Sequence, residues 1–177
     1  QLRGAVIGLA KIPVKSGGRG GDDDAPVILR AHNLPKRLHR LHCAHQVHVH
    51  HGGEVANTTG DGILAYFRRH KADPIAAIRE CQRVLGDLGN VTFTYGLERG
   101  RAVLRETRVG DRLDRALSGE AVNRAAKLQD ICPDLGIDVA IGPDFARKMK
   151  SPGVLREAGT ARLSSGAGET PVWTLAP

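Results

Sequence analysis

The chain has 177 residues, of which 41% are hydrophobic, and it is long enough for one domain with a sizeable core. No apolar run reaches the roughly 18 residues of a membrane span, so no membrane contact is predicted. Its net charge of +7 favours an anionic partner, yet one Trp, two Tyr and three Phe offer few platforms for stacking bases, which favours a nucleotide over a nucleic acid. Cys43, Cys81 and Cys132 form no Cys-x-x-Cys pair, which argues against a zinc site or disulfide framework and for reduced thiols in a cytoplasmic setting.

The first residues predict a buried strand followed by an insertion. The chain begins with Gln1 rather than Met, which indicates a fragment or processed product of a larger protein. Residues 4–12 are a short apolar run closed by Pro13, the pattern of a buried strand. Residues 13–33 are predicted to be a flexible insertion within a single domain that spans residues 1–177. Three consecutive aspartates at positions 22–24 belong to it, and a solvated acidic loop is a better interpretation of them than a metal site.

A histidine-rich helix is predicted next. Apolar residues recur at helical spacing between residues 27 and 51, and Gly52 and Gly53 are suited to end the helix. Six of the eight histidines lie here, at positions 39, 42, 45, 48, 50 and 51. We interpret them as a solvated helix face, because no cysteine or clear set of carboxylates accompanies them; a metal site is the less favoured alternative.

One carboxylate stands between two glycines at the centre of a predicted hairpin. Residues 53–55 and 63–67 are the expected strands, and Gly60 and Gly62 permit a tight two-residue turn at Asp61. Such a turn would hold the Asp61 carboxylate at a rigid tip, where it suits a metal ligand. The alternative is that Asp-Gly is simply favourable turn chemistry.

The second half of the chain alternates helices and strands. Asp73 and Pro74 predict the start of a helix over residues 75–88. A strand is expected at residues 91–97, and residues 101–104 continue it as a strand or a ragged hairpin. The remaining elements are a helix at 119–130, a strand at 137–141, a short helix at 143–148, and closing strands at 154–155 and 171–175. The resulting β-α-β-β-α-β order predicts an α+β fold, a ferredoxin-like sheet with C-terminal α/β extensions.

Two polar residues share one face of the predicted helix at residues 119–130. Asn123 and Lys127 are four positions apart, so their side chains project on the same side. A neutral donor beside a cation can clamp a phosphate. The alternative is an ordinary pair of surface residues.

Three segments of the chain resemble the class III nucleotidyl cyclases, the adenylate and guanylate cyclases. They are the metal hairpin at residues 52–67, the following strand and turn at residues 96–100, and the second signature helix with its approach at residues 112–128. The resemblance covers residues 4–176 and is weak in residues 13–50.

This resemblance implies a ferredoxin-like core that pairs head to tail with a second cyclase domain, so that active sites form at the dimer interface. The family reaction is attack of the ribose 3′-hydroxyl of a nucleoside triphosphate on the α-phosphate, which releases pyrophosphate. Two Mg²⁺ or Mn²⁺ ions, held by two aspartates, lower the pKa of the hydroxyl and neutralise the triphosphate. An asparagine and an arginine from the partner's helix orient the ribose and stabilise the transition state.

The resemblance carries over to these residues only in part. Asp61 matches the second metal aspartate and Asn123 the ribose-orienting asparagine. Lys11 falls where the first metal aspartate is expected; a charged lysine repels a metal ion, so one ion is expected rather than two. Lys127 replaces the transition-state arginine, which keeps the charge and loses the bidentate fork.

The base-reading positions are altered as well. Asn57 stands at the lysine that reads the base in the family, and Ala116 stands near the usual partner of that lysine. The choice between adenine and guanine is therefore not readable from these residues. Two functions follow as alternatives: a cyclase with reduced or no turnover, or an inactive cyclase-like module that acts in regulation or dimerisation, as a homodimer or a heterodimer.

Overall fold

The computed structural model describes residues 2–11, 43–59, 62–68, 73–87, 93–149, 153–163 and 168–177. The predicted insertion at residues 13–33 lies outside these ranges. The strands are β1 (Leu2–Lys11), β2 (Gly53–Thr59), β3 (Gly62–Phe67), β4 (Thr94–Val109), β5 (Arg112–Ser118), β6 (Val139–Ile141), β7 (Leu155–Ala161) and β8 (Thr170–Leu175). The helices are residues 43–50, α2 (Pro74–Asp87), α3 (Glu120–Asp130), α4 (Cys132–Leu135) and α5 (Pro143–Ala146). No helix within the described ranges has the length and apolarity that crossing a membrane requires.

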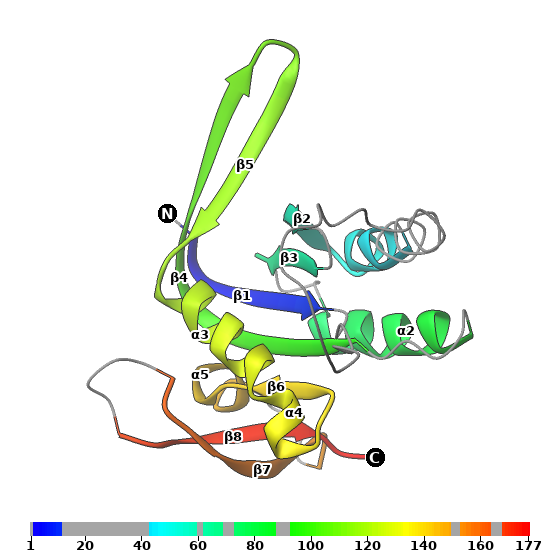
Figure 1. Cartoon of the computed structure of the whole chain (residues 1–177), viewed down its shortest axis with the longest axis vertical. Coiled ribbons are helices and arrows are strands. Elements are labelled where there is room, and N and C mark those ends of the chain that lie inside the picture. The colour runs from blue at the N-terminus through cyan, green and yellow to red at the C-terminus, as the bar shows by residue number, and fades with distance from the viewer. Residues whose placement is uncertain are drawn as a thin grey trace, which may run out of the picture.

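The strands form one eight-stranded sheet in the order β2-β3-β1-β4-β6-β8-β7, with β5 paired to β4 outside this path (Figure 1). The pairs β2–β3, β3–β1 and β1–β4 are antiparallel. This arrangement of the first four strands is ferredoxin-like, so the predicted α+β fold is confirmed. β6 extends the sheet parallel to β4, and the last two strands add to it antiparallel.

Two cores lie on opposite faces of this sheet, because successive residues of a strand point to opposite sides. On β3, Ile63, Ala65 and Phe67 belong to the core under the helix at residues 43–50 and α2. Tyr66 belongs to the other core, which also includes residues of α3. The strand predicted at residues 63–67 is therefore packed on both faces.

Two glycines of β4 allow α3 to lie directly against the sheet. A Cβ at Gly96 would collide with the Ala125 carbonyl, and one at Gly100 would lie 2.9 Å from the Cβ of Ala121. Side chains hold the same contact, since the Gln129 amide donates to the Thr94 hydroxyl over 2.8 Å. Only glycine gives the helix this close approach.

The same glycines explain an error in the sequence interpretation. The predicted turn at residues 96–100 is absent, and β4 runs unbroken through residues 101–104, for which a ragged hairpin was considered. Glycine serves close packing here and not chain reversal. A strand at Arg112–Ser118 was not predicted; it pairs with the far part of β4 and forms a long arm that projects from the body (Figure 1).

The helix at residues 43–50 is the described part of the histidine-rich helix. It ends as predicted at Gly52, whose φ of 79° is the left-handed conformation that favours glycine. The solvated-face interpretation holds for His45 and His50, which are exposed. It is wrong for His48, which is 3% exposed because it lies one helical turn from the buried Ala44.

The start of α2 follows the predicted capping chemistry. The backbone N–H of Ala76 donates to the Asp73 carboxylate over 2.9 Å, and Pro74 occupies the first position of the helix. Asp73 is therefore the N-cap. α2 then places Ile75, Ile78 and Cys81 in the core beside the helix at residues 43–50.

Candidate functional site

The end of β1 lies beside the hairpin that carries the predicted metal ligand. Thr59 pairs with Gly62 across β2 and β3, and Asp61 precedes Gly62 in the sequence but lies outside the described residues. On the next strand, the backbone of Lys11 pairs with the same Gly62. The register therefore puts position 11 next to the hairpin tip, as the resemblance requires of the first metal position.

α3 carries the two other predicted catalytic residues. Asn123 and Lys127 are both exposed on this helix and are one turn apart. Among the described residues, no hydrogen bond or ion pair joins either side chain to β2 or β3. Both side chains are thus available to a second molecule or a ligand.

A partly buried ionic cluster holds α3 against the sheet and α5. Arg124 Nη2 lies 3.0 Å from Glu98 Oε2, and Arg124 Nη1 lies 3.0 Å from Asp144 Oδ2. Glu98, on β4, is 0% exposed, and its Oε1 also accepts the backbone N–H of Phe145 at 3.2 Å. Because β4, α3 and α5 each contribute a charge, the cluster fixes the helix that carries Asn123.

Burial dominates the electrostatics of Glu98. It raises the pKa of this carboxyl, while the backbone N–H of Arg99 and the charge of Arg124 act in the opposite direction. Gly142 makes room for the carboxylate, since a Cβ there would collide with it. The sequence interpretation missed this cluster, although Arg124 stands between the buried Ala121 and Ala125 on α3.

Asn57 lines a polar cleft between β2 and β5. The cleft has a volume of about 630 Å³ and is lined by His45, Val55, Ala56, Asn57, Leu113, Asp114 and Arg115. The structure thus brings β5 to the predicted base-reading residue. The neighbours of Asn57 in the cleft are Asp114 and Arg115, and Ala116, which the resemblance suggested, is exposed on β5 and does not line it.

Solved structures share this architecture over almost the whole chain. A bacterial light-regulated adenylyl cyclase superposes with a TM-score of 0.76 at 19% identity, covering 99% of this chain and 52% of its own. The guanylate cyclase domain of RhGC from Catenaria anguillulae, in complex with GTP, gives 0.72 at 12% identity and covers 99% and 98%. The adenylyl cyclase CyaB from P. aeruginosa gives 0.71 at 14% identity and covers 99% and 94%.

The chain has the fold of the class III nucleotide cyclase domains. It spans about half the length of the light-regulated protein. No protein-family model matches the sequence, and no curated protein matches it. The likeness therefore establishes the fold, and the chemistry must be argued from the residues of this chain.

The expected number of metal ions depends on the donor atoms that this chain offers. Within the described ranges, no group of three or more His, Cys, Asp or Glu side chains is placed to hold a metal. The register sets the backbone of Lys11 beside the hairpin, where the resemblance implies a metal-binding carboxylate, and a lysine supplies no oxygen ligand. Asp61 can supply oxygen ligands to one Mg²⁺ or Mn²⁺ ion.

Proposed function

We propose that the chain is a cyclase-type domain of cyclic-nucleotide signalling that binds a nucleoside triphosphate and converts it to a 3′,5′-cyclic nucleotide at a reduced rate. The observation that carries the proposal is the pairing of Lys11 and Gly62 at the hairpin tip. It keeps the cyclase geometry at this edge of the sheet while replacing one metal-binding carboxylate with a cation.

Each residue has a specific role in this proposal. Asp61 holds one Mg²⁺ or Mn²⁺ ion, which when bound lowers the pKa of the attacking hydroxyl and neutralises the triphosphate. Asn123 orients the ribose, and Lys127 places a positive charge near the α-phosphate. Asn57 contacts the base from the cleft between β2 and β5.

The proposed active unit is a pair of domains. Asn123 and Lys127 are exposed on α3, so they are free to act on a nucleotide held by the hairpin of a second copy. The arm formed by β4 and β5 projects from the body (Figure 1) and exposes Leu113 to 46%. An apolar side chain on a projecting arm suits contact with a partner domain.

The alternative is an inactive module that acts through dimerisation or regulation. Lys11 is the observation that favours it, because a lysine at this position removes the second metal ion. The two functions share the fold and differ in turnover alone.

Turnover at high Mn²⁺ concentration separates the two. Purified chain is offered ATP, GTP, CTP and UTP in turn, with Asp61→Ala as a control of matched fold. A cyclic product that disappears in Asp61→Ala supports the slow cyclase. If a folded protein yields no product from any nucleotide, the cyclase proposal is wrong and the inactive module stands.

A further inference from the structure

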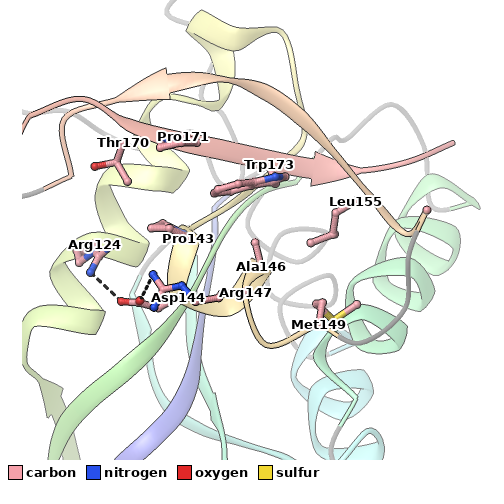
Figure 2. Close-up of a pocket in the computed structure, with 11 residues that line it drawn as sticks. Arg124, Pro143, Asp144, Ala146, Arg147, Met149, Leu155, Thr170, Pro171 and Trp173 are labelled. Atoms are coloured by element: carbon pink, nitrogen blue, oxygen red, sulfur yellow. Dashed lines mark hydrogen bonds and ion pairs between the residues drawn. The ribbon is translucent and has the colours of Figure 1, made fainter.

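A second cleft, of about 760 Å³, lies between α3, α5 and the strands β7 and β8 (Figure 2). Its volume is in the range of small-molecule sites, about 300–1,000 Å³. Apolar side chains form most of its wall: Pro143, Ala146, Met149, Leu155, Pro171 and Trp173. The residues assigned to the nucleotide, Asn57, Asn123 and Lys127, do not line it.

One side of this cleft is charged. Figure 2 shows Asp144 between Arg124 and Arg147, and both guanidinium groups lie 3.0 Å from its carboxylate oxygens. Glu98, the other partner of Arg124, is fully buried and does not line the cleft. With Glu98 counted, the two guanidinium groups and the two carboxylates carry no net charge. Glu98 offsets the charge of Arg124 from behind the wall, so Asp144 and Arg147 are the charges of this cluster at the cleft surface.

Arg147 is the cation that is open to a ligand. Its side chain is 71% exposed, and within the described residues its ion pair is with Asp144 through Nη2 alone. A guanidinium has five N–H donors in a planar fork that matches a carboxylate. A carboxylate ligand can thus bind Arg147 without breaking the pair with Asp144.

The rest of the wall suits a flat apolar body. The indole of Trp173 is partly buried in β8 and lies in the same cleft as the Pro143 and Pro171 rings. Aromatic rings stack or pack edge-on against such surfaces, which contributes binding energy beyond area burial.

We propose that this cleft is a binding site for a small aromatic monocarboxylate, whose ring packs on Trp173 while its carboxylate pairs with Arg147. The exposed guanidinium of Arg147 selects for one negative charge, and the apolar wall selects for a ring rather than a hydrated anion such as phosphate or acetate.

Trp173 makes the proposal directly measurable, because it is the only tryptophan in the chain. Purified protein is titrated with phenylacetate while tryptophan emission is recorded at an excitation wavelength that phenylacetate does not absorb. We expect a saturable change in emission. Arg147→Gln is expected to weaken phenylacetate about tenfold, the loss of one charge-assisted hydrogen-bonded pair. Arg156→Gln, an exposed arginine of β7 that does not line the cleft, is the matched control and should bind as the wild type does.

Two further probes and a change of protein concentration test which molecule occupies the cleft. Phenylacetamide, the neutral isostere, and acetate, the anion without a ring, should each bind at least about tenfold more weakly than phenylacetate. Equal binding of either one overturns the proposal, as does an emission that phenylacetate leaves unchanged at millimolar concentration. If the tryptophan emission depends on protein concentration and not on phenylacetate, a second copy of the chain fills the cleft. That result also overturns the proposal. None of these readouts depends on nucleotide turnover.

Discussion

The two halves of the proposed nucleotide site differ in the buried groups that hold them, which are charged under one half and neutral under the other. The α3 half, with Asn123 and Lys127, is held by Arg124, which pairs with the fully buried Glu98 and with the partly exposed Asp144. The hairpin half rests on the helix at residues 43–50 and on α2, where the buried polar groups are neutral. The residues expected to contact a transition state thus have an ionic anchor, while the hairpin that carries the predicted metal ligand is supported by packing.

The neutral support is centred on His48. Its Nδ1 lies 2.7 Å from the Ala44 carbonyl oxygen, and the Cys81 sulfur lies 3.7 Å from the same nitrogen. The ring faces Phe67 of β3 with 6.1 Å between centroids. Burial lowers the pKa of His48 and raises the pKa of Cys81 to about 12, so both groups are uncharged at neutral pH.

Breaking the ionic anchor should have the largest effect. Arg124→Met removes the partner of the fully buried Glu98, which we expect to lower the free energy of unfolding by about 3 kcal/mol, the cost of leaving a buried charge unpaired. Urea denaturation measures it. Arg147→Gln removes only an exposed partner of Asp144 and should cost less than about 0.5 kcal/mol.

A double variant tests whether charge is the cause. Glu98→Gln combined with Arg124→Met removes both charges, and it should recover most of the lost stability. If the double variant is as unstable as Arg124→Met alone, Arg124 supports α3 by packing and the ionic half of the comparison is wrong.

In the hairpin half, a carboxylate restored at position 11 should increase the rate of cyclic-nucleotide formation. Lys11→Asp is expected to raise cyclic-nucleotide formation at high Mn²⁺ about a hundredfold, because it removes a repelling cation and adds an oxygen ligand. Lys11→Ala removes the cation alone and should give a much smaller gain. Equal rates in the two variants would mean that position 11 does not contact the metal ions.

The sequence predicted the parts of these two halves whose signals are local. Residues 63–67 are a β-rich apolar run that follows a glycine-flanked turn, and Asp73 caps α2, so the hairpin and the helix were both recognised. Arg105 to Arg108 of β4 are all exposed, so the arm shows no alternation between apolar and polar residues and β5 was missed. Periodicity appears only where one face of a strand is buried.

Other features depend on contacts between distant segments. Glu98 and Arg124 belong to different elements, and no local sequence pattern in either segment predicts their ion pair. The role of His48 was hidden among the six histidines of the predicted helix, since only the packing of α2 and β3 shows that this one is buried. Asp61 was predicted as a metal ligand and stays a prediction, because it lies outside the described residues.

The two halves should also differ in the sign of their pH dependence, which is the smallest of the expected effects. His48 has a lowered pKa in the fold, so below pH 6.5 the unfolded chain binds a proton that the folded chain does not. The free energy of unfolding then decreases by up to about 1.4 kcal/mol for each pH unit that the pH falls. Glu98 has a raised pKa in the fold, so the folded chain binds the extra proton above the ordinary pKa of 4.5. The contribution of Glu98 to the free energy of unfolding therefore decreases as the pH rises from 4.5 toward the pKa of the folded state.

Difference curves against two variants separate these contributions. Urea unfolding is measured between about pH 4.5 and 8 for the wild type, His48→Leu and Glu98→Gln, with the exposed His45→Gln as the control for a solvated histidine. The wild type minus His48→Leu difference should rise with pH below 6.5, and the wild type minus Glu98→Gln difference should fall in the range above 4.5. Parallel curves for the wild type and His48→Leu would show that His48 titrates alike in both states. The hairpin half would then not depend on a neutral histidine, because a group that gains no proton on unfolding contributes no pH dependence.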